Sequence, residues 1–122
     1  MNFDDAIDKL RAICLALPEA SEGGGVGNPT FRVRDKIFAM QHPFKDRPSM
    51  WCKAPRGFQE MIVNSDSEHF FVPPYVGKNG WIGLWLDMEL DWDHIAELVE
   101  ESYRMTAPKR LLKLLPTSPE KS

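Results

Sequence analysis

Cysteine, histidine and long apolar runs are scarce in this chain of 122 residues. The two cysteines, Cys14 and Cys52, lie far apart, which excludes a disulfide framework and predicts reduced thiols. No apolar run is long enough to span a bilayer, and the first residues, MNFDDAIDKL, lack the basic-then-apolar pattern of a secretory signal. We therefore expect a cytoplasmic protein with no membrane partner.

Glycine-rich nucleotide-binding motifs are missing as well. The segment EASEGGGVGNPT is rich in glycine, but Thr30 stands where a dinucleotide fingerprint needs its third small residue. The chain also has no Gly-Lys-Ser/Thr sequence, which a Walker loop requires. We expect this segment to be a loop, or at most a short edge strand.

Catalytic and metal-binding patterns are equally weak. Cys14 falls on the apolar side of the first predicted helix, and Cys52 shares the inward face of a strand with Met50, so both thiols are predicted to be inert packing. The spacing of the three histidines does not suit a metal site; they are His42, His69 and His94. The seven carboxylates in residues 87–101 are typical of a solvated helix face. We predict no cofactor, no metal site and no enzymatic activity.

The net charge of −3 hides a strong asymmetry along the chain. Residues 32–56 hold seven basic and two acidic side chains, and residues 102–122 hold five basic and one acidic. Residues 57–101 hold one basic and ten acidic side chains, and residues 1–31 hold two basic and five acidic. These blocks predict one basic and one acidic surface.

Hydrophobic periodicity predicts helices near both ends of the chain. Apolar residues recur at helical spacing from Phe3 to Leu17, behind Asn2 as the N-cap. A second amphipathic helix follows Asp91, its predicted N-cap, and a short last helix is expected to begin at Thr106. Another short helix is expected after Pro55, with a buried edge formed by Phe58, Met61 and Ile62.

Between these helices the pattern indicates strands. Alternation predicts a hairpin over 30–41 with its turn at Asp35-Lys36, a strand over 49–53 and a last strand over 81–87. Residues 70–77 are expected to be extended, and Asn79-Gly80 to form a turn. Strands in a run favour an α+β fold: a mostly antiparallel sheet with the N-terminal and C-terminal helices packed on one face. Residues 1–116 are expected to form this single domain, and residues 117–122 a disordered tail.

The sheet face turned away from the helices is the strongest functional candidate. Alternation places Phe31, Val33, Met50, Cys52, Ile82, Leu84 and Leu86 inward. It places a mixed basic and aromatic set outward, namely Arg32, Arg34, Trp51, Lys53, Trp81 and Trp85. Cations that meet phosphates and indoles that stack on bases suit nucleic acid. Gly83, between two of the tryptophans, marks a place where a backbone or ligand approaches closely.

Three further cations belong to this prediction. Lys78 lies at the predicted turn before the last strand, where it can reach a phosphate. Lys109 and Arg110 lie in the first turn of the last helix, where the helix dipole disfavours cations. Two interpretations of that pair stay open: a binding site, or ion pairing with the acidic helix just before it.

Three stretches together resemble the MmcQ/YjbR-like family: RVRDKIFA, PPYVGKNGWIGLWLD and ELVEESYRMTAPKRL. The resemblance spans nearly the whole chain. It implies a small α+β domain related to the bacterial frataxin (CyaY) fold, likened to the double-wing DNA-binding module of a phage transcription factor. Family members are often labelled DNA-binding, but the family has no established activity or catalytic residues.

The leading hypothesis is therefore a non-enzymatic domain that binds DNA or another nucleic acid with its sheet face and hairpin tips. A second hypothesis is a protein-interaction or self-association module that uses the same face. A third is a small-molecule site lined by Tyr75, Trp81 and Trp85, which predicts a deep pocket there.

Overall fold

Six strands form one antiparallel sheet in the order β1-β2-β3-β4-β6-β5. The computed structural model describes residues 3–25 and 28–115. Its elements are α1 (Phe3–Leu15), β1 (Ser21–Gly25), β2 (Asn28–Val33), β3 (Lys36–Gln41), β4 (Ser49–Lys53), α2 (Phe58–Ser65), β5 (Phe70–Phe71), the 3₁₀ turn η1 (Gly77–Asn79), β6 (Trp81–Trp85), α3 (Trp92–Thr106) and α4 (Lys109–Leu112). The predicted α+β class with an antiparallel sheet is confirmed. The predicted cap at Asn2 and the tail at 117–122 lie outside the described residues.

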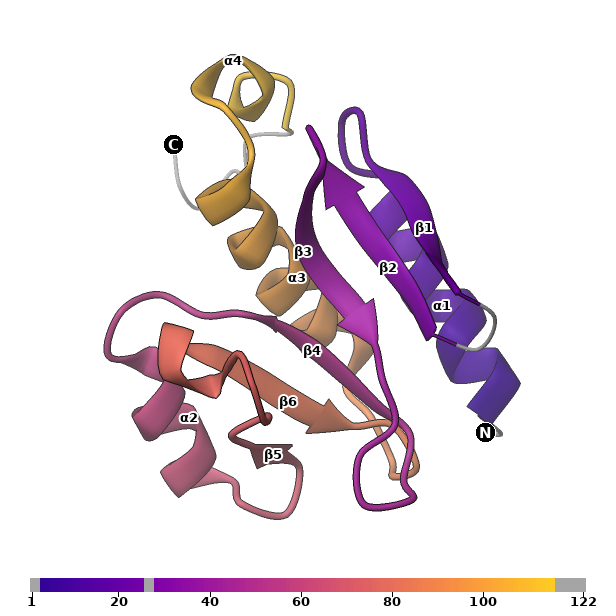
Figure 1. Cartoon of the computed structure of the whole chain (residues 1–122), viewed down its shortest axis with the longest axis vertical. Coiled ribbons are helices and arrows are strands. Elements are labelled where there is room, and N and C mark those ends of the chain that lie inside the picture. The colour runs from indigo at the N-terminus through magenta and orange to yellow at the C-terminus, as the bar shows by residue number, and fades with distance from the viewer. Residues whose placement is uncertain (1–2, 26–27, 116–122) are drawn as a thin grey trace.

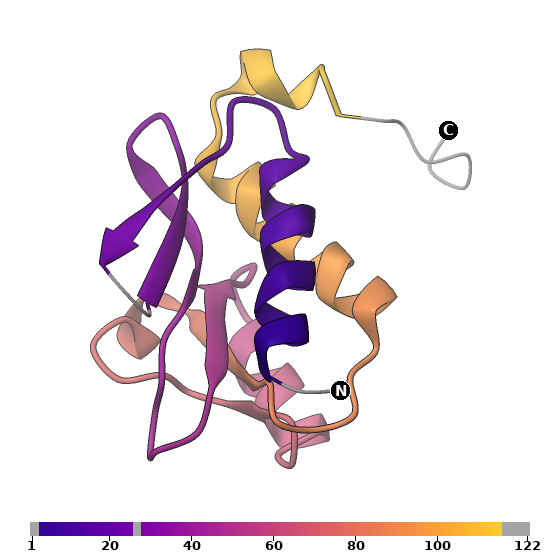
Figure 2. The ribbon, with the colours of Figure 1, turned by 90° about the vertical axis from the view of Figure 1, so that its right-hand side faces the viewer.

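Helices α1 and α3 cover one face of the sheet, side by side (Figures 1 and 2). In α1 the buried residues Ala6, Leu10 and Cys14 follow the predicted stripe. In α3 the carboxylate of Asp91 accepts a hydrogen bond from the His94 backbone N–H and caps the helix as predicted. All seven residues that were predicted to point inward lie in the core between sheet and helices: Phe31, Val33, Met50, Cys52, Ile82, Leu84 and Leu86.

The β2–β3 hairpin turns at Arg34 and Asp35, one residue earlier than predicted. Both have positive φ, 52° and 65°, as a type I′ turn requires. The turn stands beside α4 at one end of the molecule (Figure 1). At the same end of the molecule, the Tyr103 hydroxyl donates to the Pro18 carbonyl at 2.7 Å and links α3 to the chain that leaves α1.

The glycine-rich segment forms the edge strand β1, the second of the two forms expected for it, paired along its length with β2. Two other local predictions are wrong. Thr106 ends α3, donating its hydroxyl to the Ser102 carbonyl, and Pro108 is the N-cap of α4. On α2, Phe58 and Met61 are exposed instead of buried. Among the described helices, none has the length and apolar character needed to cross a membrane.

Candidate functional site

The outward face of the sheet is not open where the tryptophans lie. Trp51 pairs with Gly83 across β4 and β6, one residue out of step with the core pair Cys52 and Ile82, so its predicted direction is right. Yet Trp51 is 2% exposed, and Trp81 and Trp85 are each 7% exposed. The prediction that these three indoles form an exposed stacking surface is therefore wrong.

Aromatic side chains of the same chain cover this face. Phe71 stacks on Trp85 with ring centroids 4.2 Å apart, and Phe44 lies parallel to both rings. His42 stacks on Trp51 at 4.5 Å. The result is a second, smaller aromatic core on the side of the sheet that carries neither α1 nor α3.

Polar contacts complete this second core. The Arg47 guanidinium lies 4.1 Å from the Trp85 ring centroid and forms a two-pronged ion pair with Asp87, at 2.9 and 2.8 Å. The Trp51 indole N–H donates to the Ser49 hydroxyl at 3.0 Å. The three indoles are therefore internal packing and are not available for a base to stack on.

The tryptophans also fail to form the pocket of the small-molecule hypothesis. Tyr75 is exposed, whereas Trp81 and Trp85 are buried. The backbone around Trp81 is held by Gln59, whose amide donates to the Gly77 and Trp81 carbonyls at 2.6 and 2.7 Å. These three aromatic side chains therefore do not line one open cavity.

Cations gather instead at one end of the sheet. Lys36 begins β3 and Lys53 ends β4, and because these strands are antiparallel neighbours, both residues lie at the same end. Lys53 pairs across the strands with Trp81, and Lys78 lies three residues before that tryptophan. We call this surface the cationic end and define it by Arg34, Lys36, Lys53, Arg56, Lys78, Lys109, Arg110 and Lys113.

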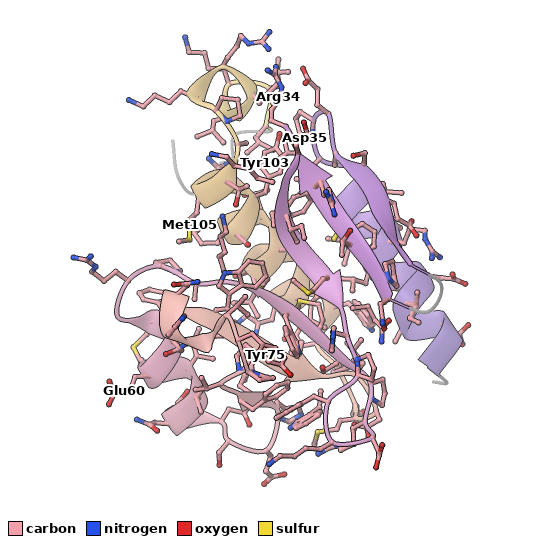
Figure 3. All side chains as sticks on the ribbon, viewed as in Figure 1. Arg34, Asp35, Glu60, Tyr75, Tyr103 and Met105 are labelled. Atoms are coloured by element: carbon pink, nitrogen blue, oxygen red, sulfur yellow. The ribbon has the colours of Figure 1, made fainter. Side chains whose placement is uncertain are left out.

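The last turns of α3 hold the cationic end together. The Ser102 hydroxyl accepts the backbone N–H of Lys53 at 2.9 Å. Met105 lines a hollow together with Arg56 and Lys78. Arg34 lies close enough to Tyr103 for its positive charge to influence the Tyr103 hydroxyl. Figure 3 shows Arg34, Tyr103 and Met105 along this end, below α4. One helix terminus thus brings together cations that are distant in the sequence.

Most of these cations are available to a ligand. Arg34 is paired with Glu19 at 2.9 Å, and Lys53 is half-buried. Burial, and then the neighbouring Lys36, lower the pKa of Lys53. The remaining six are exposed, and none forms an ion pair with another described residue: Lys36, Arg56, Lys78, Lys109, Arg110 and Lys113. Pairing of Lys109 and Arg110 with the preceding helix is therefore not formed within the described chain.

Of the predicted site residues, Arg34, Lys53, Lys78, Lys109 and Arg110 are brought together, and the three tryptophans are not. Arg32 is half-buried on the sheet, with its Nε 3.4 Å from the Thr30 hydroxyl. The sequence prediction missed Lys36, Arg56 and Lys113. Their membership in the basic blocks was the available signal. Alternation could not find them, because Arg56 and Lys113 lie outside the strands and Lys36 was assigned to the hairpin turn.

Away from the cationic end, a hollow is lined by Asp66, His69, Glu89 and Asp91. Here the Asp66 carboxylate lies 2.9 Å from Nδ1 of His69. Hydrogen bonding to Asp66 raises the pKa of His69, and the same bond lowers the pKa of Asp66. The backbone of Glu89 is a smaller contributor to the raised pKa of His69.

The thiols are poor nucleophiles, as predicted. Cys14 and Cys52 are both buried. Burial raises the pKa of Cys52 to about 12 and that of Cys14 further still, so both stay protonated near neutral pH.

Comparisons with known proteins agree with this architecture. A family model described as YjbR matches residues 15–105. The chain is similar to the crystal structure of Deinococcus radiodurans protein DR2400, a DUF419 domain, with a TM-score of 0.74, 20% identity, and coverage of 95% of this chain and 94% of that one. It is also similar to a Pseudomonas syringae protein, with a TM-score of 0.60, 19% identity and coverage of 87% and 99%. At these identities the likeness shows the fold alone. No curated protein matches the chain.

Proposed function

The chain belongs to the YjbR family, and we propose that it is a non-enzymatic domain that binds the phosphate backbone of DNA or another nucleic acid through its cationic end. The observation that carries this proposal is the gathering of exposed cations from β3, the β4–α2 loop, η1 and α4 around the end of α3, none of them in an ion pair with another described residue. Phosphate neutralisation by lysine and arginine dominates the affinity of such contacts.

The geometry favours phosphate contact over base reading. Trp51 and Trp85 are covered by Phe71, Phe44 and His42, so they cannot stack on unpaired bases. Cations on turns and strand ends suit backbone contacts, which position a protein without reading sequence. The proposed binding is therefore weak, insensitive to sequence and strongly dependent on salt.

The resemblance to the CyaY fold and to the double-wing DNA-binding module is part of the same proposal. We propose a CyaY-like, double-wing arrangement in which the β2–β3 hairpin with Arg34 and the turn with Lys78 serve as the two wings. Both carry cations at their tips, which supports contact with two stretches of backbone. The proposed setting is the cytoplasm.

Fluorescence anisotropy with labelled single-stranded and double-stranded DNA at low salt tests this proposal. We expect micromolar binding to at least one form, with an affinity that falls steeply as salt rises. The double variant Lys109→Glu/Arg110→Glu should reduce binding by about tenfold or more, since two attractive contacts become repulsive.

The matched control is Lys45→Glu, a charge reversal in the loop between β3 and β4 at the opposite end. Lys45 is exposed and lies 5.4 Å from the Phe44 ring centroid. It should leave binding nearly unchanged. Absence of micromolar binding to either form of DNA, or equal losses in both variants, would overturn the proposal.

A further inference from the structure

A cleft of about 310 Å³ runs between α2 and α3. Its α3 wall uses His94, Glu97, Leu98 and Glu101, which recur at helical spacing and therefore form one face of that helix. Its α2 wall is formed by Phe58, Met61 and Ile62. The cleft is thus a groove between two helices, a shape that accepts a helical segment.

The apolar wall of this groove is exposed to solvent. Phe58 is 44% exposed and Met61 is 54% exposed, and α2 has no buried residue among those described. Ile62 is half-buried and packs against the core, which fixes the helix in place. Adjacent large apolar side chains left open in this way are typical of interaction sites.

The opposite wall is acidic. Glu97 and Glu101 are exposed, lie one helical turn apart and form no ion pair with another described residue. Glu100, between them, forms an ion pair with Arg104 at 3.3 Å. Lys53 also lines the cleft and offsets part of this charge. An occupant that complements the groove therefore needs apolar side chains and cations.

The segment that begins with α4 has this chemistry. Lys109, Arg110 and Lys113 are exposed and unpaired within the described chain, and Leu114 is 64% exposed. Leu111 and Leu115 are buried, so they anchor the segment to its own domain. The cations and Leu114 point outward. Pairing with the helix before them was one of the two interpretations of Lys109 and Arg110, and carboxylates of that helix lie in the groove.

We propose that the α4 segment of one copy docks in the α2–α3 groove of a second copy, with its cations on Glu97 and Glu101 and Leu114 against Phe58 and Met61. Figure 1 shows α4 at the top of the molecule and α2 at its lower left, so a two-fold rotation that sets two copies antiparallel along their long axes offers each α4 to the other groove. The contact is small, so the pair is weak and depends on protein and salt concentration.

Sedimentation equilibrium of the full chain without nucleic acid tests this proposal. The expected result is a reversible dimer with a dissociation constant in the micromolar range. Two charge-reversal variants separate the contacts: Glu97→Lys/Glu101→Lys makes both surfaces basic, and Lys109→Glu/Arg110→Glu makes both acidic. Each alone should dimerise about tenfold more weakly or worse, because like charges now face each other.

The decisive experiment measures association in a mixture of the two variants. Each carries the α4 charge that the other's groove now needs, so the mixture should restore association to near the wild-type level. The control Lys45→Glu reverses a charge in the β3–β4 loop, away from both proposed contacts, and should dimerise normally. Circular dichroism verifies that every variant is folded.

Three outcomes would overturn this proposal: a wild-type protein that stays monomeric at high concentration, a variant mixture that stays monomeric, or a control that loses association. The outcome is independent of nucleic-acid binding because none is present. The Glu97→Lys/Glu101→Lys variant should lose dimerisation while still binding DNA, which separates failure of this inference from failure of the proposed function.

Discussion

The ring of Phe71 lies directly over the Cα of Gly83, its partner across β5 and β6. A Cβ built on Gly83 would fall within the space of that ring. The glycine therefore allows Phe71 to reach Trp85 and close the aromatic core on the outward face. The close approach that a glycine inside a strand predicts is present, and what approaches is a phenylalanine of the same chain rather than a ligand.

Gly83→Ala should destabilise the protein by about 1–3 kcal/mol, the usual cost of forcing extra atoms into packed space. The free energy of unfolding from urea denaturation measures this effect. Because the clash is with Phe71, adding Phe71→Leu should recover part of the loss.

Gly23→Ala is the matched control, since a Cβ there would meet the Thr30 hydroxyl at an ordinary 3.5 Å. It should change the free energy of unfolding much less than Gly83→Ala does. Equal effects at the two glycines would show that Phe71 does not fill the space above Gly83.

Phe71→Ala should uncover Trp85. We expect a loss of about 2–3 kcal/mol, below the range for a fully buried phenylalanine because Phe71 is only half-buried. Tryptophan emission should shift to longer wavelength as water reaches the indole. Phe58→Ala, at low protein concentration, removes an exposed ring and should change neither quantity; a shift of similar size in that variant would count against the aromatic cover.

Asp87→Asn should weaken the ion pair that holds the Arg47 guanidinium over the Trp85 ring. Pairing with Arg47 lowers the pKa of Asp87, so its contribution is present above the unfolded pKa of about 3.9 and is lost as pH falls through the lower native value. Both side chains are more than a third exposed, so the effect is small and fades with salt. Urea denaturation should separate variant and wild type at neutral pH and bring them together in strong acid, whereas a difference that persists in strong acid would exclude the ion pair as its cause.

The His69–Asp66 pair should stabilise the protein over a limited pH window. The raised pKa of His69 gives stability that is present below about 6.5 and is lost as pH rises through the native value. The lowered pKa of Asp66 gives stability that is present above about 3.9 and is lost as pH falls through its native value. The pair therefore contributes most between these limits.

An NMR titration of His69 measures the pair directly. Its midpoint should lie above the ordinary histidine value, and Asp66→Asn should move it down. Asp46→Asn, a change in another loop, is the control and should leave the midpoint in place. A midpoint that ignores Asp66→Asn would mean that the carboxylate does not pair with the ring in solution.

Much of the fold could be predicted because its signals are periodic. The apolar stripe of Ala6, Leu10 and Cys14 and the alternation in β2, β4 and β6 determine which side chains enter the core. Alternation also gave the direction of Trp51 and Trp85 correctly. It could not show what lies above them, because Phe44 and Phe71 come from a loop and a two-residue strand with no periodic pattern.

The cationic end was harder to predict for a related reason. Lys36 and Lys53 are neighbours only because β3 and β4 are antiparallel and adjacent, and Arg56 and Lys78 meet only beside Met105. Such sites are assembled from element ends, which tertiary structure brings together. The block charges indicated that a basic surface exists, and the topology determines where it lies.

The most direct test of nucleic-acid binding at the cationic end is an NMR titration of the ¹⁵N-labelled protein with a short DNA duplex at low salt. We predict that amide shifts concentrate at Arg34, Lys36, Lys78 and the α4 segment, while the indole N–H signals of Trp51 and Trp85 stay in place and the shifts vanish at high salt. Shifts centred on those two indoles, or no shifts at all, would contradict binding at the cationic end.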